Sequence, residues 1–197
     1  MIAPLAAEIA ACRACAERFA RTATAHAPRP VIRLSATARL LIAGQAPGAR
    51  VHASGLPFDD ASGERLRDWL GLDRATFYDP SRVAIAPMAF CFPGYDDRGA
   101  DLPPPPLCAR LWRARVVAAM PQVELEVLVG AHAQKWRLGA RAKPTLTETV
   151  RAWREYLPAA LPTPHPSWRN TAWLKRNPWF EAELAPQLRA RVAQLVR

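Results

Sequence analysis

The sequence predicts an α/β fold of three layers, in which helices cover both faces of a central four-stranded parallel sheet. Short apolar runs bounded by glycine and proline alternate along the chain with helical patterns, which is typical of strands joined by crossover helices. The chain has 197 residues, of which 50% are hydrophobic, so it can bury one full core. We therefore expect a single domain over residues 1–197.

The expected elements follow one another from the N-terminus. They are a helix at 1–20, a polar connector at 21–37, a strand at 38–43, a helix at 62–71, an apolar run at 82–90, a helix at 107–120, a strand at 125–130, a helix at 145–157, a strand at 159–163 and a final helix starting at 177–178. Thr145 and Glu148 occupy capping-box positions, and Asn177 and Pro178 suit an N-cap and a first turn. The prolines at 103–106 exclude a helix or central strand there, so 93–106 is predicted to be a loop.

Charge gives two interpretations. The formal net charge is +10 and the pI is about 10.5, which suits a polyanionic partner such as nucleic acid. However, 24 of the 27 basic residues are arginine, in a chain rich in alanine and proline, as a GC-rich coding sequence also produces. No stretch approaches the roughly 18–20 continuous apolar residues of a membrane span. We expect a cytoplasmic monomer without membrane contact.

Four cysteines are too few for a disulfide scaffold in a chain of this length. Cys12 and Cys15 form a C-x-x-C pair, whereas Cys91 and Cys108 lie far downstream. A close pair and two remote thiolates can complete four-fold ligation of a metal centre if the fold brings them together. Spacing alone equally allows a set of buried thiols.

Three loops are expected to meet at the carboxyl edge of the sheet, where ligands bind in open α/β folds. They are GQAPGARVHASGLPF at 44–58, AFCFPG at 89–94 and TPHPSWRN at 163–170. The first is neither a dinucleotide fingerprint nor a P-loop, because G-x-G-x-x-G and G-K-[ST] are both missing. The sequence therefore contains no phosphate-binding motif that would support a nucleotide-processing enzyme.

These loops carry a resemblance to the uracil-DNA glycosylase superfamily. Residues 44–63 keep every interval of the pattern G-E-A-P-G-x-x-E-D-x-x-G-x-P-F-x-x-x-x-G found in its iron–sulfur members, called family 4. His165-Pro166-Ser167 resembles the second signature, H-P-[SA], and 174–178 resembles the leucine-arginine-proline stretch that follows it. The cysteines also fall in the family's order. The resemblance covers nearly the whole chain.

The resemblance implies a ligand set and a site. It implies that Cys12, Cys15, Cys91 and Cys108 bind a structural [4Fe-4S] cluster that clips residues 1–37 to the proline-rich loop, with zinc as the alternative. It places His165 at the leaving base as a hydrogen-bond donor, and Phe58 beneath the flipped ring. The other residues implied in the substrate pocket are Gly44, Ala46, Pro47, Gly48, Pro87 and Ser167, and Gln45 or His52 is the catalytic candidate that handles the water.

The chain departs from family 4 where that family carries its catalytic carboxylates. Gln45 replaces the glutamate of G-E-A-P-G, and Val51-His52 replaces the glutamate-aspartate pair. An amide can position water but cannot accept its proton, so His52 is the candidate base, or else a surface residue of the loop. Pro87 replaces the asparagine that reads the uracil edge, so strict preference for uracil does not follow.

The last loop interleaves aromatic and cationic residues. Trp168, Arg169, Lys175 and Arg176 could stack on bases and pair with phosphates, although the aromatic residues could also pack as a lid on the core. The resemblance thus implies a monofunctional DNA glycosylase that removes uracil or another deaminated base. The alternative is a non-catalytic iron–sulfur relative that binds DNA or a damaged base through the same pocket.

Overall fold

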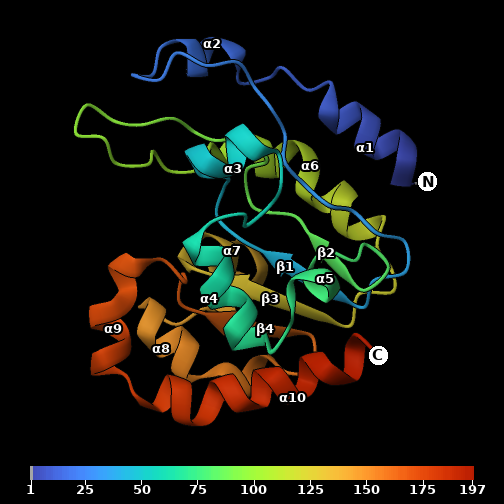
Figure 1. The fold of residues 1–197 in the computed structure, drawn as a ribbon, viewed down its shortest axis with the longest axis vertical. Coiled ribbons are helices and arrows are strands. Elements are labelled where there is room, and N and C mark those ends of the chain that lie inside the picture. The colour runs from blue at the N-terminus through green and yellow to red at the C-terminus, as the bar shows by residue number, and fades with distance from the viewer. Residues whose placement is uncertain (1) are drawn as a thin grey trace.

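The computed structural model describes residues 2–197 and confirms the predicted fold class (Figure 1). Within these residues, strands β1 (Leu40–Ala43), β2 (Val83–Ile85), β3 (Leu125–Val129) and β4 (Ala160–Thr163) form one parallel sheet in the order β2-β1-β3-β4. Every residue of the four strands is buried, as expected for a parallel sheet covered on both faces.

Alternate side chains of the strands pack under two different helical layers. Leu40, Ile42 and Val127 face the layer made by α4 (Ala61–Leu70), α8 (Leu146–Arg151) and α10 (Ala185–Leu195). Leu41 and Ala84 face the opposite layer, made by α1 (Ile2–Ala10) and α6 (Pro106–Ala118). In Figure 1, α10 of the first layer lies below the sheet, and α1 and α6 of the second layer lie above it. The strand period of two therefore supplies both hydrophobic cores.

The N-terminal segment differs from the single helix predicted over residues 1–20. Helix α1 ends at Ala10 and α2 (Ala16–Ala20) begins after Cys15, so the C-x-x-C pair lies in a turn between two short helices. Met1 lies outside the described residues. Both cysteines therefore lie in this turn and not within one continuous helix.

Most other boundaries agree with the sequence to within a few residues, and the Thr145–Glu148 capping box is present. Several short helices were not predicted: α3 (Ala49–Ser54), α5 (Arg74–Phe77), α7 (Ala131–Leu138) and α9 (Thr171–Arg176). Asn177 follows α9, and its side chain donates to the Trp173 carbonyl instead of capping the next helix. After Pro178 the chain passes through a π-helical turn, η4 (Phe180–Leu184), into α10.

A buried ion pair joins α6 to the sheet. Arg113 of α6 is fully buried, donates to Glu126 of β3 and to the carbonyl of Ala86, and burial lowers its pKa. Arg137 of α7 donates to the second carboxylate oxygen of Glu126 at 2.9 Å. Because a buried charge is costly unless it is paired, this network fixes how α6 and the end of β2 sit against the sheet.

Candidate active site

A cavity of about 630 Å³ opens at the carboxyl edge of the sheet. Its lining comes from the 44–58 loop, from the chain after β2 and from the loop after β4, as the topology requires. The predicted residues that line it are Gly44, Gln45, Ala46, Pro47, Gly48, Phe58, Pro87, His165, Ser167, Trp168 and Arg169. The volume is in the range of small-molecule sites.

His165 lies in this cavity as a neutral hydrogen-bond donor. Burial lowers the pKa of its imidazole, an effect that the charges of Asp60 and Asp101 oppose. The backbone N–H of Ser167 donates to Nδ1 at 3.2 Å, so in the neutral ring the proton is on Nε2. The Asn170 side chain donates to the His165 carbonyl at 2.7 Å. The loop therefore leaves one N–H of the imidazole for a ligand.

The Phe58 ring forms an apolar wall of the cavity, and its backbone adopts a strained conformation that the surroundings support. It has a φ of 55°, a region that a bulky residue rarely adopts without support from its surroundings. A Cβ on Gly63 would lie 1.7 Å from the Phe58 carbonyl oxygen, so only glycine fits there. Tyr78 donates its hydroxyl to the neighbouring Pro57 carbonyl at 2.9 Å. These contacts fix the ring in position at the cavity.

Pro87 lies beside the 44–48 segment because the β1–β2 pairing continues beyond the strands. Ala86 N–H donates to Ile42 at 3.0 Å, and Met88 N–H donates to Gly44 at 2.9 Å. Pro87 falls between these two donors, at a position whose N–H the ladder does not use. Proline is tolerated there, and it offers the cavity no side-chain donor or acceptor.

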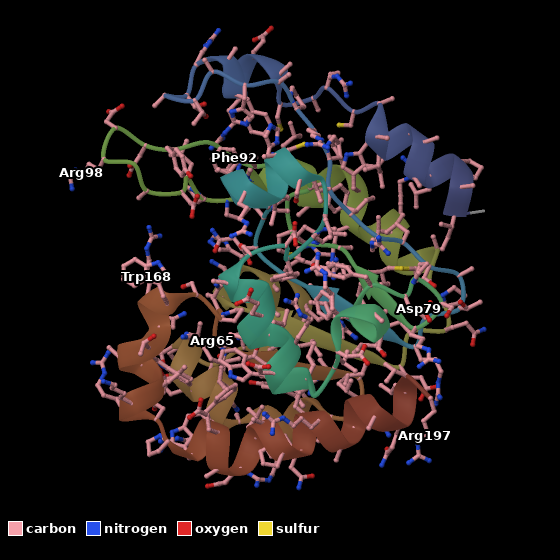
Figure 2. All side chains as sticks on the ribbon, in the orientation of Figure 1. Arg65, Asp79, Phe92, Arg98, Trp168 and Arg197 are labelled. Carbon is pink, nitrogen blue, oxygen red and sulfur yellow. The ribbon has the colours of Figure 1, made fainter. Side chains whose placement is uncertain are left out.

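The outer rim carries an exposed aromatic residue. Trp168 is 75% exposed, in the short helix η3 (Trp168–Asn170), and the Arg169 guanidinium lies 5.7 Å from its ring centroid. Figure 2 shows Trp168 projecting from the molecule across from the loop that carries Arg98. Lys175 and Arg176 are exposed on α9, outside the cavity lining.

Sequence patterns did not single out Arg65, although it positions the His165 loop. From α4, it donates to the Ser167 carbonyl at 3.0 Å and lies 3.4 Å from the Thr171 hydroxyl. An arginine in an amphipathic helix carries no signal of such a role. Asn170 was missed for the same reason, because its contact to His165 depends on the conformation of η3.

The structure does not bring His52 into the cavity, which argues against its predicted role as base. Helix α3 turns the ring toward His26, at 5.1 Å between centroids, and toward Phe92, at 5.9 Å. Its Nδ1 is buried without a hydrogen-bond partner among residues 2–197, and burial lowers its pKa. Arg29 donates to its carbonyl, so the residue helps to attach α3 to the N-terminal segment.

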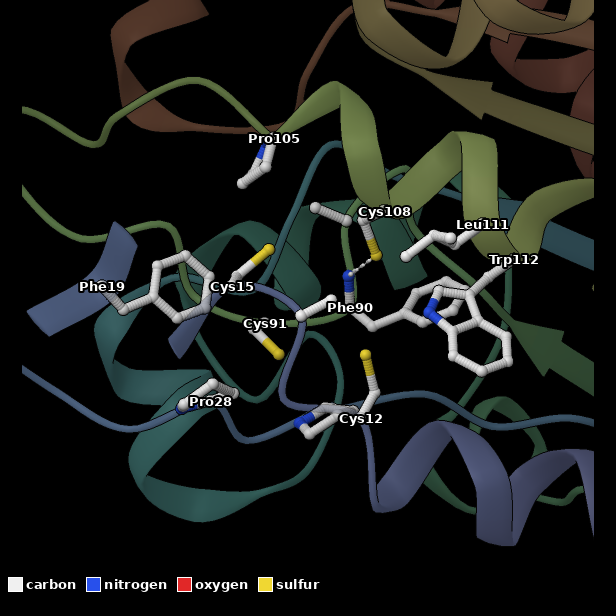
Figure 3. Close-up of a pocket in the computed structure, with 13 residues that line it drawn as sticks. Cys12, Cys15, Phe19, Pro28, Phe90, Cys91, Pro105, Cys108, Leu111 and Trp112 are labelled. Carbon is white, nitrogen blue, oxygen red and sulfur yellow. Dashed lines mark hydrogen bonds between the residues drawn. The ribbon is translucent and has the colours of Figure 1, made fainter. Parts of the chain in front are cut away.

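The four cysteines line a second, smaller pocket (Figure 3). The other walls are apolar, including Phe19, Phe90 and Trp112. Burial raises the pKa of Cys91 to about 12 and that of Cys108 to about 11, and the Phe90 N–H lies 3.4 Å from the Cys108 sulfur. As placed, no three acidic, histidine or cysteine side chains within residues 2–197 converge tightly enough for a single metal ion.

Four thiolates can hold one zinc ion at about 2.3 Å from a single centre, or an iron–sulfur cluster, which distributes its thiolates over several irons. The residues that would hold either group are Cys12, Cys15, Cys91 and Cys108, around the apolar pocket.

No helix within residues 2–197 has the length and apolar character needed to cross a membrane.

Comparison with protein families agrees with the observed fold. The model of the uracil DNA glycosylase superfamily matches residues 31–189, a span that contains the whole sheet, the 44–58 loop and His165. Members of this superfamily act as DNA glycosylases. The chain therefore belongs to the uracil DNA glycosylase superfamily.

Proposed function

We propose that the protein is a monofunctional DNA glycosylase that hydrolyses the N-glycosidic bond of uracil or another deaminated base. The observation that carries this proposal is the His165 imidazole, whose Nε2–H remains for a ligand in a cavity that Phe58 also lines. A base in DNA reaches such a cavity by leaving the stack, which costs least when it is damaged or mispaired.

The reaction needs a donor where negative charge develops on the departing base. A preorganised donor at such a position typically contributes about 3–4 kcal/mol. A neutral imidazole can be this donor, and because it carries no charge it does not cancel the charge of a nearby carboxylate. A lyase step would instead need an amine nucleophile. No lysine is among the described residues that line the cavity, which supports hydrolysis without strand cleavage.

Pro87 favours a tolerant choice of base. Sites that read a base edge by hydrogen bonds reject analogues strongly, because a wrong analogue leaves buried polar groups unpaired. At this wall the cavity presents proline, and Phe58 offers a π-face that any base can stack on. We therefore place uracil, hypoxanthine and xanthine together as candidate substrates.

The test is base release from oligonucleotides that carry uracil, hypoxanthine or xanthine, followed by alkaline scission. We expect abasic sites with the unmodified protein, and a loss of about 10²–10³-fold in rate with His165→Ala. His132→Ala is the matched control, because His132 is exposed on α7 and lies outside the cavity lining. Binding of all three oligonucleotides without base release would contradict the proposal.

That contrary result would support the second candidate, a non-catalytic protein that binds DNA or a damaged base. One observation favours it: Gln45 stands where family 4 has a glutamate, and His52 lies outside the cavity. An amide holds water without accepting its proton. The two functions differ in turnover and share the same pocket.

We further propose that Trp168, Arg169, Lys175 and Arg176 contact DNA around the cavity mouth. Each phosphate contact contributes about 0.9 to the slope of log affinity against log salt. Reversing Arg169 and Lys175 to glutamate should weaken binding and reduce that slope by about 2. Arg197→Glu is the control, because Figure 2 places Arg197 far from Trp168. An unchanged slope in the Arg169 and Lys175 variant would reject this assignment.

We also propose that Cys12, Cys15, Cys91 and Cys108 hold a [4Fe-4S] cluster, as in family 4. Its contribution would be structural, tying the turn between α1 and α2 to the chain after β2 and to α6. Anaerobically purified protein should be brown, absorb broadly near 400 nm and contain about four irons and four sulfides per chain. Stoichiometric zinc without iron in that preparation would establish the alternative.

A further inference from the structure

Two carboxylates line the cavity among its described residues, and neither comes from the positions that family 4 uses. They are Asp60, which directly precedes α4, and Asp101, in the loop between β2 and α6. Both line the cavity together with His165, and the charge of each opposes the lowering of the His165 pKa. The missing carboxylates of the 44–58 loop thus have possible substitutes from elsewhere in the chain.

Asp60 already has a structural task. Its Oδ1 accepts the Gly63 N–H at 2.8 Å and caps the N-terminus of α4. This cap holds the turn in which Gly63 passes against the Phe58 carbonyl. Removal of the Asp60 side chain would therefore disturb the floor of the cavity.

The Asp101 side chain, in contrast, makes no hydrogen bond or ion pair with the described residues and is exposed to solvent. Its backbone is held in a hairpin at 94–102, where it pairs with Tyr95 across an antiparallel bridge. Leu102 N–H donates to the Gly94 carbonyl at 2.9 Å, and Asp96 accepts from two backbone N–H groups of the turn, both at 2.9 Å. A fixed backbone therefore carries an unused carboxylate into the cavity.

The base of this hairpin is anchored to the N-terminal segment. The Phe92 carbonyl accepts from His26 Nε2 at 2.9 Å, and the Phe92 ring packs edge-on against Tyr95 at 5.1 Å. His26 also stacks on Phe19 at 4.9 Å. Figure 2 shows Arg98 at the tip of the hairpin, across from Trp168. Asp101 and His165 thus reach the same space from two sides.

We infer that Asp101 is the catalytic carboxylate of this enzyme and accepts the proton of the attacking water. The inference rests on the glycosylase function proposed above. The water oxygen forms a bond to C1′ of the deoxyribose while the bond from C1′ to the base nitrogen breaks. The electron pair of that bond leaves with the base, whose charge the His165 Nε2–H stabilises. The water proton passes to Asp101 and then to the released base, giving an abasic site and a neutral base.

The test compares three substitutions under single-turnover conditions. Asp101→Asn keeps size and removes the basic oxygen, so we expect base release to slow by about 10²–10⁴-fold. Asp97→Asn, in the same hairpin but outside the cavity lining, should release base at the unmodified rate. Asp60→Asn keeps a good N-cap and should slow the reaction much less than Asp101→Asn.

Two further measurements separate catalysis from structure. Affinity for an oligonucleotide with an abasic product should not weaken in Asp101→Asn, because this substitution removes a negative charge from a surface that meets phosphates. Added formate should partly restore base release in Asp101→Ala, because a small carboxylate can occupy the vacated space and accept the proton. A merely structural side chain would not be replaced in this way.

The outcomes distinguish the two proposals. If the unmodified protein releases base, and Asp101→Asn does so within twofold of its rate, the role of Asp101 is wrong and the glycosylase function stands. A larger loss in Asp60→Asn than in Asp101→Asn would assign the carboxylate to Asp60 and overturn the inference. If the unmodified protein and His165→Ala are both inactive on all three oligonucleotides, both proposals fall.

Discussion

Two pockets among residues 2–197 share one stretch of chain but differ in chemistry. After β2, Pro87 lines the wide cavity of His165, whereas Phe90 and Cys91 line the pocket of the four cysteines. The cysteine pocket is apolar apart from its thiols, whereas the wide cavity combines polar and apolar side chains. A pocket that holds a group through several thiolates can be apolar, because those bonds supply the affinity; a pocket that exchanges substrate and product needs weaker, directional contacts.

The largest effect should follow from removing a thiol. Cys91→Ser should abolish binding of the metal group and lower the free energy of unfolding by several kcal/mol, because such a group binds the folded chain and not the unfolded one. Urea unfolding with and without a chelator measures this. The chelator should destabilise the unmodified protein and leave Cys91→Ser unchanged. Equal stability of all four samples would show that the pocket is a set of buried thiols.

The second-largest effect should follow from breaking the Arg113–Glu126 ion pair, which connects the two pockets. Arg113 belongs to the helix that carries Cys108, and it donates to the carbonyl of Ala86, directly before Pro87. Glu126→Gln should cost about 3–5 kcal/mol, because it leaves the buried charge of Arg113 unpaired. The double variant Arg113→Met with Glu126→Gln should cost clearly less than the sum of the two single variants. Additive losses in urea unfolding would show that the pair does not act as a unit.

The third effect compares two glycines that lie against Phe58 in the wide cavity, Gly63 and Gly44. In Gly63→Ala the new Cβ would meet the Phe58 backbone oxygen at 1.7 Å, whereas in Gly44→Ala it would meet the Phe58 ring at 3.1 Å. The first needs a backbone shift and should cost about 3 kcal/mol, and the second needs a small ring movement and should cost about 1 kcal/mol or less. Thermal unfolding measures both. If the two alanines cost the same, Phe58 is not held as its backbone contacts indicate.

Sequence patterns predicted the residues whose signal is local. The glycine and proline spacing of 44–63 and the His-Pro-Ser run identified one wall of the cavity and its donor, which the structure brings together. The sheet was predictable because each strand is a short apolar run between turn residues. Helix α7 was missed because AHAQKWRL has only three buried residues and little apolar periodicity.

The misplaced and missed site residues depend on geometry that no local pattern carries. No helix was predicted over residues 49–54, where the six-residue helix α3 turns the His52 ring toward His26. Arg65 and Asp101 come from a helix and a hairpin that meet the His165 loop only after folding. Within the site, the residues inside the sequence motifs were thus the most predictable. The proton acceptor was the least predictable, because a distant loop can supply it.

The smallest effect is a pH dependence that should originate in the wide cavity. Burial lowers the pKa of His165 in the folded protein, so the unfolded chain takes up a proton as pH falls through about 6.5 while the folded protein does not. The contribution of His165 to the free energy of unfolding is therefore fully present above that pH. It declines below that pH, by about 1.4 kcal/mol for each unit by which the pKa is lowered. The Cys91 and Cys108 thiols, with pKa values raised to about 12 and about 11, do not titrate in this range when free of metal.

The measurement is urea unfolding of the unmodified protein and of His165→Gln between pH 5 and 8. His165→Gln should flatten the decline, and part of the remainder should respond to His52→Gln, because burial lowers the pKa of that imidazole as it also does for His132. If both variants kept the full slope, the acid sensitivity would come from elsewhere in the fold. A slope that vanished with His52→Gln alone would place it in the contact between α3 and the N-terminal segment, and His165 would then be solvated more than its position in the cavity indicates.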